Sequence, residues 1–174
     1  MNVDKQNSGL LITNFMKLLL FFGGLVVSFI MVKVFITSFS VSDESMLPGL
    51  KPGDRIYVYK WGSFGPGDVI LVKSPVEPGR VIVKRIIAGE GDSVEIRNKI
   101  LYVNDRKMDF RWPVRSGDGR IFPMSFSFRD NYPIIKLKRK EYFLLGDYLD
   151  YSLDSRFFGP VSADKIIGRV VYKL

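Results

Sequence analysis

The sequence contains neither cysteine nor histidine among its 174 residues. Without cysteine it has no disulfide scaffold, no thiolate nucleophile and no Cys-ligated metal site. Without histidine it has no imidazole base for a Ser-His-Asp triad and no His-ligated zinc. A hydrolase of this composition that works near neutral pH must take its base from Lys, Asp, Glu or a metal-bound water.

Acidic residues are fewer than basic ones: 18 Asp and Glu stand against 26 Lys and Arg, which gives a formal net charge of +8. Hydrophobic residues make up 47% of the chain, a fraction that argues against a disordered protein. The length fits one compact domain with enough chain left for a membrane anchor. The positive charge fits a domain that lies close to an anionic surface.

The long uncharged run at residues 18–32 reads LLLFFGGLVVSFIMV. A membrane-spanning helix needs about 20 mostly apolar residues, so this run alone is slightly short. After Lys33 the apolar pattern continues over residues 34–39, and the Lys33 ammonium can reach the headgroups by snorkelling. We therefore expect a transmembrane anchor over residues 18–39.

The flanking residues bear on orientation and on two alternatives to an anchor. Lys5 and Lys17 favour a cytoplasmic segment at residues 1–17, although Lys33 and Lys51 weaken the asymmetry of positive charge. A buried core helix is the first alternative, but a helix apolar on all sides at one end of a small domain has little to pack against. A cleaved signal peptide is the second, and residues 37–40 form a poor small-x-small cleavage site.

The rest of the chain, residues 40–174, has short apolar stretches separated by Pro-Gly and Gly-Asp turns. Period-two alternation and β-branched residues predict strands at 55–59, 69–72, 81–87, 93–96, 100–103, 141–145 and 168–172. A hairpin is expected at residues 97–99. The fold class is therefore mainly β: an antiparallel β-sheet domain behind a single N-terminal transmembrane helix.

Residues 105–140 differ from the rest of this domain because they are basic, aromatic and rich in Pro and Gly. We interpret them as a variable excursion from the β core that carries a hairpin of its own. No recognised nucleic-acid-binding motif accompanies the basic residues, so we expect no nucleic acid partner. We expect the basic residues to face the phosphates of a lipid bilayer, because the predicted anchor already holds the domain at the membrane.

With His and Cys absent, a simple route to nucleophilic catalysis is a hydroxyl activated by a neutral amine. Ser45 follows the predicted anchor in an irregular segment bounded by Pro48 and Gly49, where a side chain can face a cleft. A serine before Met-x-Pro is, on its own, more often an ordinary turn residue. The signal from Ser45 alone is weak.

Lys84 supplies the candidate amine. On a strand it shares one face with Ile82 and Ile86, while Arg85 points to the other face and can pair with a carboxylate there. The alternative is a solvated lysine on a sheet edge. To act as a base near pH 7, a lysine needs its pKa lowered by roughly 3 units from about 10.4, which an apolar setting favours.

Four ordered motifs behind the predicted anchor resemble the conserved boxes of the type I signal peptidases. They are Ser45-Met-x-Pro48, Gly67-Asp68-Val69-Ile70-Leu71-Val72, Lys84-Arg85-x-x-Ala88-x-x-Gly91-Asp92, and Gly146-Asp147 leading into Ser152-x-Asp154-Ser155-Arg156-x-x-Gly159. The resemblance runs from the anchor to the C-terminus and leaves out roughly residues 105–140.

The resemblance implies a role for each matching residue. Ser45 would be the nucleophile and Lys84 the general base. Ser152 would orient the lysine by a hydrogen bond, and Asp154 and Arg156 would form a structural ion pair behind the site. The backbone N–H of Ser45 would hold the oxyanion, a contribution of roughly 3 kcal/mol. This chemistry uses no metal and no cofactor, and we expect neither.

Four residues, at three places in the chain, depart from the family pattern. Asp43 stands where some members have a serine that donates to the oxyanion, so we expect its carboxylate to point away from that site. Gly49 replaces a threonine, and residues 148–149 replace Asn-Arg.

A bound substrate is expected to be extended and to pair with strand edges near residues 40–43 and 82–84. The residues predicted to bind it are Val41, Asp43, Met46, Leu50, Ile82 and Val83. An apolar pocket of this kind would favour Ala-like residues before the cut.

The resemblance implies a membrane-anchored serine endopeptidase that removes signal peptides from exported precursor proteins. It would be a single-pass protein of the bacterial cytoplasmic membrane with its catalytic domain on the extracytoplasmic side. Three alternatives remain open: a specialised enzyme of a conjugation or pilus system, a non-catalytic anchored module that binds peptides, and a self-cleaving repressor-type protease. The anchor argues against the last of these.

Overall fold

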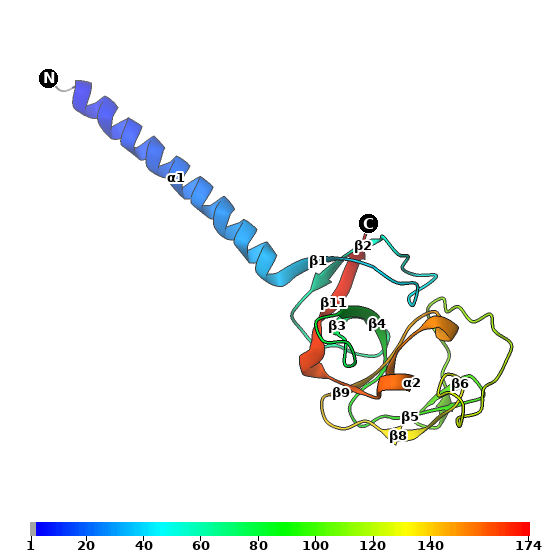
Figure 1. Cartoon of the computed structure of the whole chain (residues 1–174). Coiled ribbons are helices and arrows are strands. Elements are labelled where there is room, and N and C mark those ends of the chain that lie inside the picture. The colour runs from blue at the N-terminus through cyan, green and yellow to red at the C-terminus, as the bar shows by residue number, and fades with distance from the viewer. Residues whose placement is uncertain (1–2) are drawn as a thin grey trace. The chain divides into compact units, whose positions relative to one another are not determined.

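The N-terminal part of the protein is one long helix. The computed structural model describes residues 3–174, with side chains from residue 14 onward, and helix α1 spans Val3–Phe35 (Figure 1). Within it, Asn14–Phe35 covers 22 residues with a mean hydropathy of 2.5, and none of the residues in its most apolar window is buried. A segment of this length and composition can cross the roughly 30 Å hydrocarbon core of a bilayer.

The C-terminal end of this helix differs from the expected end of the anchor. The helix ends at Phe35, and Ile36–Ser40 form strand β1, which pairs with β2. The β-branched side chains of Ile36 and Thr37 favour a strand, which explains why the apolar pattern continues while the helix does not. At its N-terminal end the candidate span begins at Asn14, four residues before the expected start at residue 18.

The unit formed by Ser38–Leu174 contains two antiparallel sheets and only short helices. The larger sheet has the strand order β1-β2-β11-β3-β4-β9-β10 and the smaller one β7-β6-β5-β8; β5, β6 and β8 lie together, apart from β2, β3 and β11 (Figure 1). The strands of the larger sheet beyond β1 are β2 (Arg55–Tyr59), β3 (Val69–Lys73), β4 (Val81–Ala88), β9 (Glu141–Leu145), β10 (Val161–Ser162) and β11 (Ile166–Lys173). Those of the smaller sheet are β5 (Ser93–Arg97), β6 (Ile100–Val103), β7 (Arg106–Lys107) and β8 (Tyr132–Lys136). The short helices are η1 (Leu149–Tyr151), α2 (Ser155–Phe158) and η2 (Ala163–Lys165).

All of the predicted strands are present, and the mainly β fold class is confirmed. The predicted hairpin joins β5 to β6, and both Asn98 and Lys99 have positive φ, at 48° and 70°. Positive φ at both central residues is the requirement of a type I′ turn, whose twist matches that of the flanking strands. The strands missed from the sequence are β1, β7, β8 and β10, of which β7 and β10 are two residues long.

Residues 105–140 are built into the smaller sheet. They do not form a hairpin of their own: β7 pairs with β6, and β8 pairs with β5, so the excursion flanks the β5–β6 hairpin on both sides. The expectation of a separate hairpin was wrong because each strand of the excursion finds its partner in the core hairpin.

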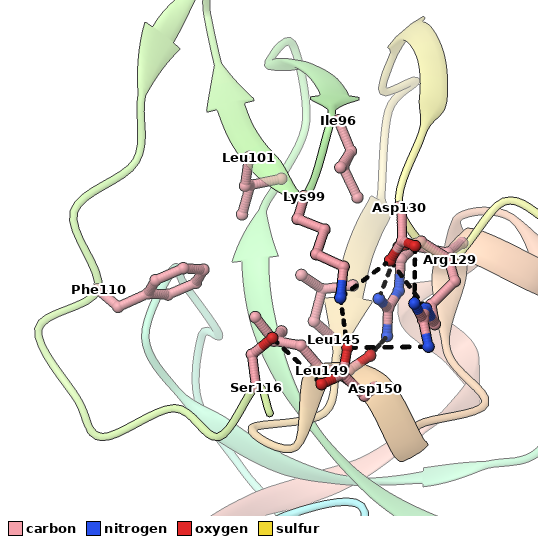
Figure 2. Close-up of a pocket in the computed structure, with 11 residues that line it drawn as sticks. Ile96, Lys99, Leu101, Phe110, Ser116, Arg129, Asp130, Leu145, Leu149 and Asp150 are labelled. Atoms are coloured by element: carbon pink, nitrogen blue, oxygen red, sulfur yellow. Dashed lines mark hydrogen bonds and ion pairs between the residues drawn. The ribbon is translucent and has the colours of Figure 1, made fainter. Parts of the chain in front are cut away.

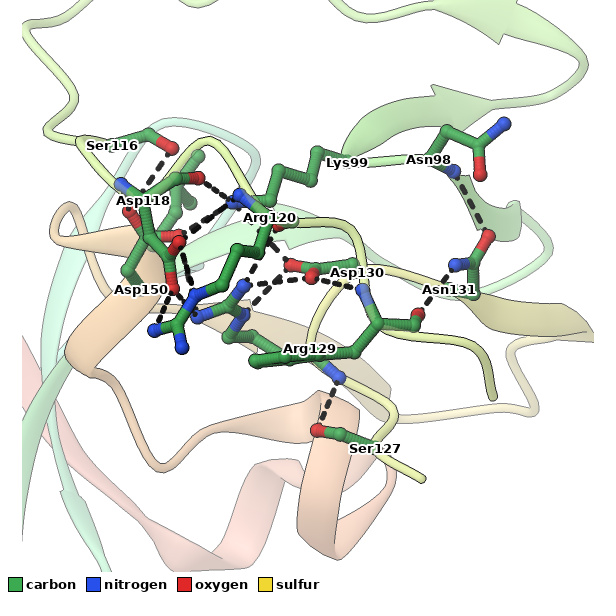
Figure 3. A network of polar contacts seen from close by, with 12 residues as sticks. Asn98, Lys99, Ser116, Asp118, Arg120, Ser127, Arg129, Asp130, Asn131 and Asp150 are labelled. Atoms are coloured by element: carbon green, nitrogen blue, oxygen red, sulfur yellow. Dashed lines mark hydrogen bonds and ion pairs between the residues drawn. The ribbon is translucent and has the colours of Figure 1, made fainter. Parts of the chain in front are cut away.

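Buried charges hold the middle of this excursion in place. The Asp150 carboxylate accepts the backbone N–H groups of Gly117 at 2.7 Å and Asp118 at 3.0 Å, and the Lys99 ammonium lies 3.1 Å away (Figure 3). Arg129 donates to Asp118 at 2.8 Å. Because Arg129 is neutralised internally, it is not one of the cations that could face a phosphate-bearing surface.

A cavity of about 120 Å³ lies against this network. Figure 2 shows Lys99 and Arg129 directed at Asp130 and Asp150 on one side, with the apolar side chain of Leu101 nearby. The charged groups in its wall bind one another, since Arg129 makes two 2.8 Å hydrogen bonds to the almost fully buried Asp130.

The core beneath β4 follows the strand's alternation. Ile82 and Ile86 belong to one buried cluster and Val83 to another, as expected for residues on opposite faces of one strand. Lys84 lies on the face of Ile82 and Ile86, and its cross-strand partner on β3 is Ile70. The lysine therefore enters an aliphatic layer, as its position in the sequence predicts.

Candidate active site

Ser45 lies in a tight turn that follows β1. The backbone N–H of Leu50 donates to the carbonyl oxygen of Met46 at 2.9 Å, and the N–H of Tyr148 donates to the carbonyl oxygen of Ser45 at the same distance. Met46 is fully buried, and Ser45 is only 4% exposed. The turn is thus fixed from below by a core side chain and from the side by the segment after β9.

The side-chain nitrogen of Lys84 donates a hydrogen bond to the hydroxyl oxygen of Ser45, with 2.5 Å between Nζ and Oγ. Lys84 is 2% exposed and lies beside the aliphatic cluster of Ile70 and Ile86. The structure therefore brings together the two residues that the sequence singled out, although 39 positions separate them.

Burial lowers the pKa of the Lys84 amine. The nearby cations Arg80 and Arg156 act in the same direction, while the carboxylates of Asp43 and Asp154 oppose it, and the net effect is a lower pKa. Desolvation penalises the charged form of an amine, so this setting favours the neutral form that can accept a proton.

The ion pair expected between Asp154 and Arg156 is present and buried. Arg156 Nε lies 2.8 Å from Asp154 Oδ1, and the backbone N–H of Gly146 donates to Asp154 Oδ2 at 3.1 Å. Asp154 also caps helix α2 by accepting the Arg156 backbone N–H. The pair therefore anchors the start of this helix to the strand end at Gly146, close to Ser45.

Ser152 is buried but does not make the expected hydrogen bond to Lys84. Within the part of the chain that the structure describes, its hydroxyl oxygen has no hydrogen-bond partner, because Lys84 donates to Ser45 instead. Ser152 packs against Gly146, where an added Cβ would overlap Ser152 Oγ and lie 2.5 Å from the Ser45 carbonyl oxygen. Glycine at this position is what allows the approach.

Asp43 lies against Ser45, which corrects the expectation that its carboxylate points away. Asp43 Oδ1 accepts the backbone N–H of Ser45 at 3.0 Å. Asp and Asn side chains commonly cap the N–H two residues further on in an Asx-turn, and this local contact was overlooked. Burial acts to raise the Asp43 pKa, but hydrogen bonds from Ser45 and the charges of Lys84 and Arg80 lower it overall.

A cavity of about 180 Å³ opens beside Ser45 and Lys84. It is lined by Asp43, Ser45, Ser74, Glu77, Arg80, Ile82, Lys84, Tyr151, Leu153 and Phe158. Of the residues predicted to bind substrate, Asp43 and Ile82 are therefore on its wall. The cavity walls contributed by the β3–β4 loop and by residues 151–158 were missed from the sequence.

The other residues predicted to bind substrate lie in the core. Val41, Met46, Leu50 and Val83 belong to one buried cluster together with Ile56, Val58 and Leu71. For Val83 the reason is the strand period, since it points to the face of β4 opposite Lys84. These four residues support the turn of Ser45 from below and do not line the cavity.

Arg85 makes its own ion pair on the other face of β4, as the alternation predicts. Its Nε and Nη2 atoms lie 2.8 Å and 2.6 Å from the two carboxylate oxygens of Asp147. The guanidinium also stacks over the Trp112 ring at 4.5 Å, which ties residues 105–140 to the strand that carries Lys84.

Metal ligands are not grouped in the described side chains. From residue 14 onward the structure has no cluster of three or more Asp or Glu residues that could hold a metal ion. The arrangement around Ser45 offers a hydroxyl, a desolvated amine and an adjoining cavity, which together suit attack on a carbonyl carbon.

An apolar N-terminal helix is followed by an antiparallel β unit in which a buried Ser–Lys pair adjoins a cavity, an arrangement suited to a hydrolase. Residues 12–174 match the family described as signal peptidase, peptidase S26. The chain belongs to this family, and the resemblance noted in its motifs is confirmed.

Comparisons with individual proteins support this family membership. The chain is 33% identical over 159 residues to signal peptidase IB of Staphylococcus aureus, covering 85% of this chain and 82% of the relative. It is 34% identical over 140 residues to signal peptidase I U of Bacillus subtilis (strain 168), covering 78% and 73%. The crystal structure of a signal peptidase I from Enterococcus faecalis V583 matches with a TM-score of 0.50 and 22% identity, over 63% of this chain and 98% of that one. This last likeness supports the fold.

Proposed function

We propose that this protein is a membrane-anchored serine endopeptidase that removes signal peptides from exported precursors, with Ser45 as nucleophile and Lys84 as general base. The observation that carries the proposal is the 2.5 Å hydrogen bond between Lys84 Nζ and Ser45 Oγ at a buried site whose lysine pKa is lowered. Family membership supplies the substrate class, since signal peptidases act on signal-peptide-bearing precursors.

In the first half of the reaction, neutral Lys84 takes the proton from Ser45 Oγ as that oxygen attacks the carbonyl carbon of the scissile bond. The carbonyl oxygen becomes an oxyanion. When the tetrahedral intermediate collapses, the C–N bond breaks and Lys84 returns the proton to the leaving amine. The products are the mature protein with a free N-terminus and a signal peptide esterified to Ser45.

In the second half, Lys84 takes a proton from a water molecule that attacks the ester. The bond between Ser45 Oγ and the acyl carbon breaks, Lys84 passes the proton to Ser45 Oγ, and the signal peptide leaves with a free C-terminal carboxyl group. Ser152 is a positioning residue in this account: its buried hydroxyl accepts a hydrogen bond from Lys84 once acylation has turned Ser45 Oγ into an ester oxygen, which is a weaker acceptor. The Asp154–Arg156 pair keeps the segment that carries Ser152 in place.

The substrate adds as a strand beside β4. Strand β3 pairs with Val81–Arg85, whereas the pairing with β9 involves Arg85, Ile86 and Ala88. Among the described pairings, the start of β4 therefore keeps one unpaired edge next to Lys84. An extended peptide can pair along such an edge and place alternate side chains in the adjoining cavity, whose volume of about 180 Å³ suits small residues.

The proposal includes a single-pass topology, which the apolar N-terminal helix supports. Asn14–Phe35 spans the bacterial cytoplasmic membrane once, so the lipid bilayer is a permanent partner. The β unit lies on the extracytoplasmic side, where precursors emerge with their signal peptides still in the membrane. Nucleic acid has no part in this account.

The experiment is cleavage of secretory precursors by the purified full-length protein in detergent, with cut sites mapped by mass spectrometry. We expect wild type to cleave after a small residue, and Ser45→Ala and Lys84→Ala to lose cleavage. The matched controls Ser42→Ala and Lys73→Ala change an exposed serine and an exposed lysine near the site and should retain it. Cleavage retained by either dyad variant would refute the proposal.

A panel of precursors in the same assay distinguishes a general enzyme from a specialised one. Cleavage of many unrelated precursors indicates the general role, and cleavage of one class indicates a conjugation or pilus system. Binding of precursor peptides without cleavage, and without labelling of Ser45 by an acylating probe, would instead establish a peptide-binding module.

A further inference from the structure

The backbone N–H of Ser45 is already occupied by a negative charge. Asp43 Oδ1 accepts it at 3.0 Å, and Ser45 is only 4% exposed, so little water competes for the contact. In the reaction the same N–H is the donor placed to hold the oxyanion. A carboxylate and an oxyanion cannot share one buried donor, because two adjacent anions in a poorly solvated site repel strongly.

We propose that Asp43 is a carboxylate plug on the oxyanion site, which an incoming substrate carbonyl displaces, and that Arg80 holds the displaced carboxylate. The inference rests on the proposed function and adds to it a residue that sets the rate of acylation. The exchange breaks no covalent bond: Asp43 gives up the Ser45 N–H, the substrate oxygen takes it, and Asp43 closes on Arg80.

The position of Arg80 fits this role. Its Nη2 atom lies 3.7 Å from Asp43 Oδ2, the oxygen not bonded to Ser45, so a short movement of the carboxylate brings full contact. Its other terminal nitrogen, Nη1, donates a 2.8 Å hydrogen bond to each carboxylate oxygen of Glu77. Glu77 thus orients one terminal nitrogen of the 45% exposed Arg80 side chain, and the other terminal nitrogen faces Asp43.

The loop that carries Arg80 is braced. The backbone N–H of Ser74 donates to the Arg80 carbonyl oxygen at 2.9 Å, and Ser74 Oγ accepts the N–H of Glu77 at 3.1 Å. The Asp43 side chain is 33% exposed and lines the cavity, so it has room to turn about its side-chain torsions. The moving part is therefore one carboxylate, which lies between the Ser45 N–H and the Arg80 guanidinium.

The displacement also acts on Lys84. Four charged groups influence this amine: Asp43 and Asp154 favour its protonated form, and Arg80 and Arg156 oppose it. When Asp43 moves from Ser45 to Arg80, its negative charge is neutralised and its hold on the Lys84 proton weakens. Substrate entry thus frees the oxyanion donor and assists the base in one step.

The test measures kcat, KM and pH profiles for cleavage of one precursor peptide by full-length variants. Asp43→Ala should raise kcat about tenfold, because a hydrogen bond to a charged group no longer has to be broken, and should shift the acid limb of the profile to lower pH. Asp43→Asn keeps an acceptor without the charge and should give a smaller increase. Arg80→Ala should lower kcat about tenfold with little change in KM, because the displaced carboxylate loses its ion pair.

The double variant Asp43→Ala/Arg80→Ala decides the matter. Its kcat should match that of Asp43→Ala, because Arg80 has no carboxylate to bind once Asp43 is replaced. The control Glu44→Ala removes an exposed neighbouring carboxylate and should behave as wild type.

Two outcomes would overturn the plug: a lower kcat in both Asp43 variants, or an equal loss from Arg80→Ala with and without Asp43. If Asp43→Ala fails to melt cooperatively, Asp43→Asn carries the test. Loss of cleavage in Ser45→Ala, measured alongside, shows that the proposed function stands even where the plug fails, and retained cleavage there shows the reverse.

Discussion

The Nζ atom of Lys84 lies 2.5 Å from the Oγ atom of Ser45, and neither residue is more than 4% exposed. An amine at this distance in water would be protonated at neutral pH, whereas burial beside aliphatic side chains lowers the Lys84 pKa. Burial favours the neutral form of the lysine, which can act as a base, but burying this amine also lowers the stability of the folded protein. The effect on stability can be measured.

Lys84→Met should abolish cleavage and stabilise the protein at neutral pH. The lysine pKa is lower in the folded than in the unfolded state, so the unfolded state binds more protons, and wild-type stability rises with pH until the unfolded value near 10.4 is passed. Methionine fills a similar volume without this cost. Thermal unfolding at pH 7 and pH 9 should show a higher Tm for the variant and a steeper rise with pH for wild type. A lower Tm for the variant at pH 7 would show that burying the amine costs the fold less than its hydrogen bond to Ser45 contributes.

Gly146→Ala should reduce cleavage severely. A Cβ at this position would overlap Ser152 Oγ and lie 2.5 Å from the Ser45 carbonyl oxygen, and overpacking of this kind costs about 1–3 kcal/mol. The nucleophile's turn must shift to relieve it. The matched control is Gly117→Ala, since a Cβ there meets no atom within 4 Å. Equal kcat values for the two variants would mean that the close approach at Gly146 does not matter.

Asp154→Asn should destabilise the protein by about 3–5 kcal/mol, because it leaves the buried Arg156 guanidinium without its countercharge. Urea unfolding measures the loss. Asp105→Asn is the control, because Asp105 pairs with Arg97 at 3.2 Å while 84% exposed, and exposed pairs contribute little. A loss below about 1 kcal/mol for Asp154→Asn would contradict the structural role of this ion pair.

Asp150→Ala should loosen residues 105–140 by removing the acceptor of the Gly117 and Asp118 N–H groups and the partner of Lys99. We expect a loss of about 2–4 kcal/mol, since hydrogen bonds to a charged group contribute roughly 1.5–3 kcal/mol each and partly overlap. Hydrogen exchange should show faster exchange in this segment. Unchanged protection there would indicate that the network does not order the excursion.

The pH dependence of that network has a definite sign. Burial acts to raise the Asp150 pKa, but the hydrogen bonds from Asp118, Gly117 and Lys99 lower it overall. Its contribution is therefore present above the unfolded pKa of about 3.9 and disappears as the pH falls through the lower folded value. Wild type should lose this stability on acidification, whereas Asp150→Asn should not.

Much of this protein could be predicted from the sequence because its signals are local and repeated. The strand alternation around Lys84 correctly placed the amine among aliphatic residues and Arg85 on the other face. The motifs correctly indicated the family. These predictions held because a strand's period and an apolar run are properties of neighbouring residues.

The predictions that were wrong or missing concern two kinds of contact. Some join segments that lie far apart in the chain, and others depend on which nearby group a side chain binds. Val83 was assigned to a pocket although its own strand period turns it into the core. Arg80 was missed because a turn loop gives no sign of which cavity it faces. The contact between the Asp43 carboxylate and the Ser45 N–H is local. The resemblance to the family predicted that the carboxylate would be repelled from the oxyanion site, and this prediction did not include the attraction between the carboxylate and the nearby Ser45 N–H.

The most direct test of the Ser45–Lys84 account is the rate at which an acylating peptide ester modifies Ser45 in the full-length protein, followed from pH 6 to pH 9 by acid quench and peptide mass mapping. The account predicts that wild type is acylated on Ser45 at a rate that rises with pH as Lys84 loses its proton, and that Lys84→Met is not acylated. Modification of a different residue, or an equal rate in Lys84→Met, would contradict it.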